Sequence, residues 1–224
     1  MALQYETDMT IVLDRSGSMG SVINETIEGY NRMLRRQREI PGECRLTLIQ
    51  FDDRTESVYV AKNLADAAEL NYENYQPRGA TALLDAIGTS VRLASTRLLA
   101  IAPEERPKHV VFVILTDGLE NASSEFDRKL VFDMIRHQRR QNRWQFMFLG
   151  ANQDAIAEAR GIGIPANAAR GFDSRHGSLE IWETVSKGLQ SLRTSQTREI
   201  PFFSAPDTPR RPQRTTDPSN PPQQ

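Results

Sequence analysis

The chain has 224 residues, of which 38% are hydrophobic and 25% are charged, and its formal net charge at pH 7 is -1. This composition is typical of a globular protein, and the near-neutral charge excludes a strong attraction to nucleic acid or to an anionic membrane surface. No run of about 18 apolar residues occurs, so the sequence predicts no membrane-spanning helix. We therefore expect neither nucleic acid nor a membrane among the partners.

A single cysteine, Cys44, leaves the chain unable to form an intrachain disulfide. It stands at the start of an apolar run, which favours a small buried core residue over a reactive thiol. The first residues show neither the basic start nor the apolar centre of a signal peptide. Together these features predict a cytoplasmic location.

The first half of the chain is predicted to alternate between strands and helices. Tyr30 and Leu34 continue a helical repeat that starts at Ile23, which places the three side chains on one face. Asp52 and Asp53 lie between two strands, where a role in the turn is favoured over metal binding. The predicted elements are a strand at 9–13, a helix at 22–39, strands at 45–51 and 56–61, and a helix at 82–100.

The second half continues this alternation around the most apolar run of the chain. Residues 109–115 are continuously apolar, which is typical of a central parallel strand covered on both faces. Leu130 and Ile135 share a helical repeat with Phe126. The predicted elements are a strand at 109–115, a helix at 126–141, a strand at 144–149, a short helix at 153–160, a strand-like connection at 161–168 and a helix at 177–193.

The order of elements predicts an α/β fold. We expect a Rossmann-like, doubly wound, mostly parallel sheet with helices on both faces and one antiparallel edge strand at 56–61. Seven of the twelve prolines fall in residues 197–224, and a segment rich in proline and polar residues cannot build a core. The chain is therefore predicted to form a domain at residues 1–196 and a disordered, proline-rich tail at residues 197–224.

Oxygen-bearing side chains follow the first predicted strand. Asp14, Ser16 and Ser18 offer one carboxylate and two hydroxyls on a loop that Gly17 opens. Hard oxygen ligands suit Mg²⁺, with Mn²⁺ as a close substitute, and do not resemble a zinc or copper site. Taken alone the pattern is weak, because Asp, Ser and Gly also form ordinary turns that cap helices.

Two further positions bring oxygens to the same edge of the predicted sheet. Asp117 follows the central apolar strand, and Thr81 ends a long loop before a helix. In a doubly wound sheet the first strand and the strand after the crossover are neighbours, so the loops at their carboxyl ends meet. Two carboxylates neutralise a divalent ion and hydroxyls add no charge, so a cation held here would take one more anionic oxygen from outside.

The segments that carry these residues follow a familiar order and spacing. Asp14-Arg-Ser-Gly-Ser18, then Gly79-Ala-Thr81, then Thr116-Asp-Gly118 resemble the metal-ion-dependent adhesion site of von Willebrand factor type A domains. The resemblance covers about residues 6–193 and includes the order of strands and helices. It makes a mere helix-capping role for the first loop much less favoured.

The resemblance implies a role for each motif residue. Ser16 and Ser18 would bind Mg²⁺ directly, and Thr81 would bind it directly or through water. Asp14 and Asp117 would act largely through water or as supporting acceptors. A carboxylate from a partner protein would complete the coordination. Stand-alone bacterial and phage members of this kind act beside other proteins, such as AAA+ ATPases, kinases or stress-response assemblies.

Three side chains near the motif are candidates for a rim that contacts the ligand. Glu120 and Asn121 follow the Asp117 motif, and Asn152 ends the neighbouring strand. The alternative for the first two is an ordinary loop role. The three histidines are scattered without the spacing of a metal site, so none is expected to be a ligand.

Two other functions stand beside a Mg²⁺-dependent protein-interaction module. A phosphohydrolase of the haloacid-dehalogenase type needs an Asp two residues after its nucleophile, and that position is Ser16. A structural subunit with an unoccupied site would be expected to have lost at least one ligand. The sequence therefore favours a binding module with no catalytic residues over an enzyme.

Overall fold

One six-stranded sheet forms the centre of the protein, with its strands in the order β3-β2-β1-β4-β5-β6. The structure is a computed structural model that describes residues 6–151, 154–172, 178–195 and Phe202. All neighbouring strands are parallel except β2 and β3, which are antiparallel. The strands are β1 Thr7–Asp14, β2 Cys44–Phe51, β3 Thr55–Asn63, β4 His109–Thr116, β5 Gln145–Gly150 and β6 Ala169–Gly171.

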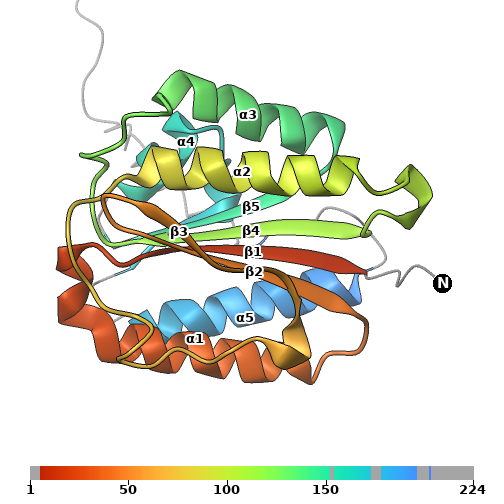
Figure 1. The fold of residues 1–224 in the computed structure, drawn as a ribbon, viewed down its shortest axis with the longest axis horizontal. Helices are drawn as coiled ribbons and strands as arrows, with labels where there is room; N and C mark the ends of the chain where they lie inside the picture. The colour runs from red at the N-terminus through yellow and green to blue at the C-terminus, as the bar shows by residue number, and fades with distance from the viewer. Residues whose placement is uncertain (1–5, 152–153, 173–177, 196–201, 203–224) are drawn as a thin grey trace, which may run out of the picture.

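Helices cover both faces of this sheet, as Figure 1 shows, with α2, α3 and α4 on one side and α1 and α5 on the other. The α-helices are α1 Ile23–Arg38, α2 Leu83–Leu99, α3 Arg128–Gln141, α4 Ala155–Gly161 and α5 Ser178–Thr194. Short 3₁₀ helices occur at η1 Gly17–Val22, η2 Leu64–Asp66, η3 Pro103–Glu105 and η4 Ala166–Ala168. The predicted doubly wound α/β fold with one antiparallel edge strand is confirmed.

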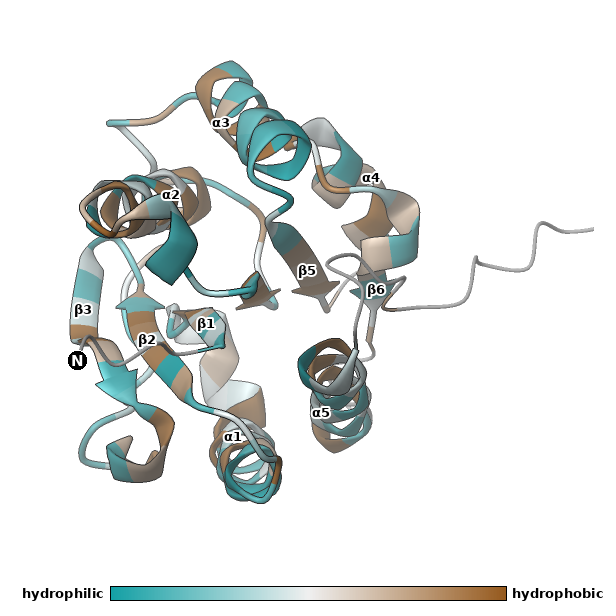
Figure 2. Ribbon diagram, turned by 90° about the vertical axis from the view of Figure 1, so that its right-hand side faces the viewer, coloured by the Kyte–Doolittle hydropathy of each residue, from teal (hydrophilic) through white to brown (hydrophobic). Residues whose placement is uncertain are grey.

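Two hydrophobic layers hold the helices against the sheet. The central strands β1 and β4 are buried along their whole length, because side chains on both of their faces pack under helices. Met9 and Ile11 face the layer under α1 and α5, whereas Val12 and Phe112 face the layer under α2 and α3. Figure 2 shows apolar strand segments lying between these helices.

The edge strand β3 departs from regular pairing with β2. The register shifts twice, between Leu46 and Leu48 and between Leu48 and Ile49. Ala61 has a φ of 48°, in the left-handed region, and its amide donates to the hydroxyl of Thr47 at 3.0 Å. Register shifts of this kind are typical of β-bulges, which bend and twist the strand that carries them.

Two local predictions are wrong. The predicted apolar face of α3 included Leu130 and Ile135; Ile135 is buried, but Leu130 is 45% exposed and Val131 is buried in its place. The helical repeat fits two adjacent stripes, and contact with the rest of the core selects one of them. The connection at 161–168, predicted to be strand-like, contains a 3₁₀ helix, and the short strand β6 follows it.

The predicted tail at residues 197–224 lies outside the described residues, apart from Phe202. Phe202 is partly buried and packs against both hydrophobic layers. None of the described helices is both long and apolar enough to cross a lipid bilayer.

A close contact between α1 and α5 depends on a glycine. Gly29 of α1 lies against the indole of Trp182, and a Cβ placed at Gly29 would be 2.1 Å from Cδ1 of that ring. Trp182 is fully buried and makes an edge-to-face contact with Tyr30, with ring centroids 5.8 Å apart. The two helices can approach this closely only because position 29 has no side chain.

We predict that Gly29→Ala destabilises the protein by about 1–3 kcal/mol, because overpacking outweighs the helix propensity that alanine adds. The measurement is the free energy of unfolding by urea titration. Gly20→Ala is the matched control, since a Cβ there meets nothing within 4 Å. A Gly29→Ala protein as stable as the wild type would contradict the packing argument.

Candidate metal centre

Asp14 ends β1 inside the protein, with both carboxylate oxygens occupied by hydrogen bonds. Its side chain is 0% exposed. Oδ1 accepts the amide of Ser16 at 2.6 Å, and Oδ2 accepts the hydroxyl of Thr116 at 2.5 Å. Because Thr116 is the last residue of β4, this bond joins the carboxyl ends of the two central strands.

The loops that follow these strands meet through their side chains. The hydroxyl of Ser18 donates to Oδ1 of Asp117 at 2.6 Å, and it lies 3.1 Å from the hydroxyl of Ser16. The parallel pairing of β1 with β4 brings these residues together across 99 positions of sequence. The adjacency of the two strands, which the sequence analysis expected, is therefore confirmed.

Thr81 contributes a third hydroxyl from the loop before α2. Its side chain is buried, and a Cβ placed on Gly118 would lie 2.9 Å from Oγ1 of Thr81 and 3.6 Å from Oγ of Ser18. The missing side chain of Gly118 thus leaves open a small space that both hydroxyls border. All five predicted ligand residues belong to this one end of the sheet.

Burial makes the negative charge of the site unfavourable without a cation. Burial raises the pKa of Asp14 to about 6, against the opposing hydrogen bonds from Thr116 and Ser16, and the charge of Asp117 adds to the rise. Burial also raises the pKa of Asp117. A bound cation would favour the charged form of both carboxyls.

The donor set fits a hard divalent cation. Every side chain of the site offers oxygen, from two carboxylates and three hydroxyls. Among the described residues, no group of three or more His, Cys, Asp or Glu side chains could hold a metal ion. An ion at this end of the sheet would therefore depend on hydroxyls as well as carboxylates, as Mg²⁺ accepts.

An ion-pair network centred on the buried carboxylate of Asp52 fixes the loop that carries Thr81. Asp52, which is 0% exposed, accepts Nε of Arg15 at 3.0 Å and Nε of Arg78 at 2.8 Å. The same two arginines pair with Glu56 at 2.7 and 2.9 Å. Asp52 therefore links the two loops of the site and does not lie among the candidate ligands, which agrees with the favoured turn role.

Backbone hydrogen bonds tie the same loops together. The amide of Arg78 donates to the carbonyl of Arg15 at 2.8 Å, and the amide of Gly17 donates to the carbonyl of Gly79 at 3.2 Å. The buried phenol of Tyr75 donates to the carbonyl of Asp14 at 2.6 Å. Sequence analysis missed Tyr75, because a lone tyrosine in a polar connection carries no distinguishing signal.

Glu120 and Asn121 hold the start of α2. Oε2 of Glu120 accepts the amide of Leu84 at 2.8 Å, and Oδ1 of Asn121 accepts the amide of Thr81 at 2.9 Å. The amide of Leu84 lies in the first turn of α2 and has no partner within the helix, so Glu120 supplies one. Asn121 thus holds Thr81 directly and Glu120 holds the helix that follows it, roles that the rim hypothesis did not include. Asn152, the third rim candidate, lies outside the described residues.

The comparisons with known proteins identify the family of this chain. The family model described as the von Willebrand factor type A domain matches residues 8–180. The chain belongs to this family. No curated protein sequence matches the chain.

Solved structures share the type A fold at low sequence identity. A pilus adhesin, SpaC from Lactobacillus rhamnosus GG, is 15% identical over 84% of this chain and 30% of its own length, with a TM-score of 0.60. Proximal thread matrix protein 1 from the mussel byssus is 16% identical over 83% of this chain and 46% of its own, with a TM-score of 0.58.

Two more solved structures share the fold at similar identity. A second structure of the mussel protein is described as having a zinc-occupied MIDAS motif (TM-score 0.55, 16% identity, 84% of this chain and 46% of that one). A von Willebrand factor type A protein from Catenulispora acidiphila has a TM-score of 0.54 and 15% identity over 84% of this chain and 43% of its own. This chain spans less than half the length of each of these structures.

We predict that Asp14→Asn stabilises the metal-free protein at pH 7 by about 1–3 kcal/mol, because it removes a buried charge whose pKa burial has raised from 3.8 to about 6. Asparagine can still accept the amide of Ser16. The measurement is urea unfolding in EDTA, followed by the same titration with Mg²⁺, which should stabilise only the wild type.

The pH dependence of this difference follows from the raised pKa. Well below 3.8, the ordinary pKa of an aspartate, Asp14 is protonated in both the folded and the unfolded state, so the wild type loses nothing relative to Asp14→Asn. As the pH rises through about 6, the folded state must give up a proton that it holds more tightly, and the wild type loses stability. A difference that shrinks over this range would contradict the burial argument.

Proposed function

We propose that this chain is a protein-interaction module that holds a divalent cation and binds a carboxylate of a partner protein. The cation is Mg²⁺, with Mn²⁺ as a substitute, and the residues that would hold it are Asp14, Ser16, Ser18, Thr81 and Asp117. The observation that carries the proposal is the contact between the β1 and β4 loops, where Ser18 joins Ser16 to Asp117.

The charge of the donor set supports capture of an outside anion. Asp14 and Asp117 together balance the two positive charges of the ion, and the three hydroxyls add none. When bound, the cation would supply Lewis acidity and a coordination position that a further anionic oxygen can take. A set with more carboxylates would retain the ion but repel an acidic partner.

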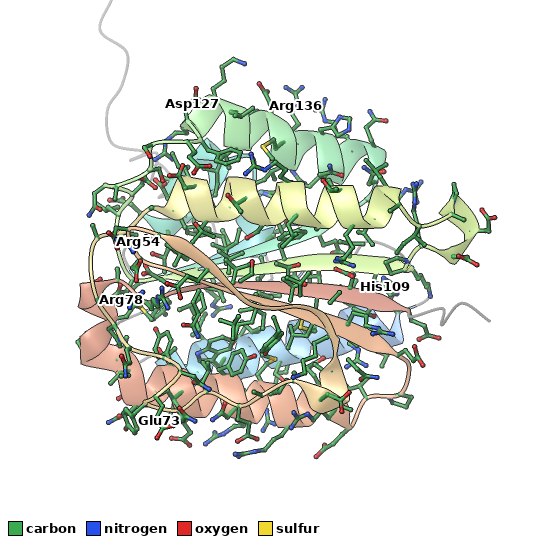
Figure 3. The ribbon with its side chains drawn as sticks, viewed as in Figure 1. Arg54, Glu73, Arg78, His109, Asp127 and Arg136 are labelled. Carbon is green, nitrogen blue, oxygen red and sulfur yellow. The ribbon has the colours of Figure 1, made fainter. Side chains whose placement is uncertain are left out.

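The surrounding residues do the positioning. Glu120 and Asn121 hold the loop of Thr81, and Thr116 and the amide of Ser16 fix the carboxylate of Asp14. Fixed ligands lose little conformational entropy on binding, which favours affinity. Arg78, which pairs with Asp52 and Glu56, lies at the same end of the molecule (Figure 3) and helps to fix the loop before Thr81.

Other observations support a binding module over an enzyme. Ser16 stands where a phosphohydrolase of the haloacid-dehalogenase type needs an acid, and the mussel relative carries a metal in the corresponding kind of motif. AAA+ ATPases, kinases and stress-response assemblies are the partner classes we propose. The single buried cysteine is consistent with a reducing cytoplasm as the location.

Calorimetric titration with Mg²⁺ and Mn²⁺ tests the metal part of the proposal. The wild type should bind one ion saturably, and Asp14→Ala and Gly118→Ala should lose at least tenfold in affinity, because the first lacks a carboxylate and the second fills the space beside Thr81. Ser57→Ala, which removes an exposed hydroxyl from β3, is the control. Equal affinity in all four proteins would refute the assigned site.

Affinity capture from the source cell tests the partner part. A protein retained by the wild type with Mg²⁺ should be released by EDTA and not retained by Asp14→Ala, while Ser57→Ala retains it. Melting curves in EDTA show whether Asp14→Ala is folded. A partner that Asp14→Ala retains, or that survives EDTA, would refute metal-dependent capture.

A further inference from the structure

A cavity lies at the opposite end of the sheet from the candidate metal centre. It has a volume of about 290 Å³ and is bordered by the last turns of α2 and α3, by the segment after η3 and by the start of β4. Figure 3 labels His109, which begins β4, at the end of the molecule opposite Arg54 and Arg78. This cavity shares no residue with the metal centre.

Positive and apolar groups line the cavity together. Arg106, Lys108 and Arg143 contribute three cationic side chains, and His137 contributes an imidazole. Among the described residues that border it, none is acidic. The floor includes Trp144, which is 6% exposed and stacks on Phe112 with ring centroids 5.6 Å apart.

Two of the cations are anchored in place. Nε of Arg106 donates to the carbonyl of Ile101 at 3.1 Å, which fixes the guanidinium. Among the described residues, no hydrogen-bond partner is seen for its two terminal nitrogens. The ammonium of Lys108 donates to the carbonyl of Ser195 at 2.9 Å. A fixed guanidinium presents parallel N–H donors that match a carboxylate or a phosphate.

Arg143 occupies a position where the backbone favours glycine. Its φ is 55°, in the left-handed region that follows a helix, and the amide of Trp144 turns back to the carbonyl of Gln138 at 3.2 Å. Glycine usually fills such a position because a Cβ is strained there. The chain instead carries an exposed arginine at the edge of the cavity.

The dipoles of α2 and α3 do not explain this cluster. Cations are favourable near the carboxyl end of a helix, which would account for Arg143 alone. Arg106 and Lys108 lie outside both helices, between η3 and β4, and still border the same cavity. Cations from separate segments thus border the same cavity as Trp144.

We propose that this cavity binds a small organic anion that carries a flat apolar group. The guanidinium groups of Arg106 and Arg143 bind the carboxylate or phosphate, and the apolar group contacts Trp144 and the neighbouring Leu98. The cavity combines apolar side chains with charged and polar ones, and small-molecule sites commonly use the first for contact and the second for orientation. The site is independent of the proposed metal-dependent function.

The two tryptophans of the chain provide the test. In ¹⁵N-labelled protein each indole N–H gives one signal, and Trp182→Phe assigns them. Trp144 borders the cavity, whereas Trp182 is buried between α1 and α5 on the other face of the sheet and serves as the internal control. The probes are phenyl phosphate, benzoate and inorganic phosphate, each titrated at constant ionic strength.

Saturable movement of the Trp144 signal alone is the expected result, with phenyl phosphate or benzoate binding at least tenfold more tightly than inorganic phosphate. The two aromatic probes distinguish a phosphate ester from a carboxylate. Arg143→Gly should lose at least tenfold in affinity while gaining thermal stability, because it relieves the left-handed backbone. Arg136→Gln removes an exposed charge from α3 outside the cavity and should bind normally.

Three results would overturn the proposal. The first is no saturable shift of the Trp144 signal with any probe. The second is the same affinity in Arg143→Gly as in Arg136→Gln, which would indicate unspecific charge attraction. The third is inorganic phosphate binding as tightly as the aromatic probes.

Discussion

The hydrogen bond between Thr116 and Asp14 joins the ends of the two central strands, and the site is built around it. β1 and β4 are buried on both faces, so their ends are held by the core and cannot drift apart. This leaves Asp14 in a place that disfavours its charge. The core thus holds a destabilised carboxylate at one edge of the sheet, and a bound cation would stabilise its charged form.

Further hydrogen bonds and ion pairs hold the loops on either side of this bond. Tyr75 and the amide of Arg78 hold the backbone of Asp14 and Arg15, and the Asp52 ion pairs fix the next loop. These ion pairs add little net stability, because the buried charge of Asp52 loses its water and the exposed part of the network is screened by solvent. Their value here is geometric, since they hold separate loops in one arrangement.

The sequence predicted those parts of the site that depend only on residue type and on the order of the strands. Asp14, Ser18 and Asp117 could be brought together because each follows a strand that the apolar pattern predicts, and the fold class fixes which strands are neighbours. The roles of Glu120 and Asn121 could not be predicted, because they depend on hydrogen bonds to amides 36 and 40 residues away. Leu130 was misplaced because periodicity alone fits two stripes of α3.

The irregular edge strand has a consequence for how this protein meets others. A straight, regular β3 would expose a row of backbone groups ready to pair with a foreign strand, a common start of aggregation. The two register shifts, the left-handed Ala61 and the outward Lys62 make that row uneven. Association is thereby directed away from indiscriminate backbone pairing and towards surfaces that side chains define.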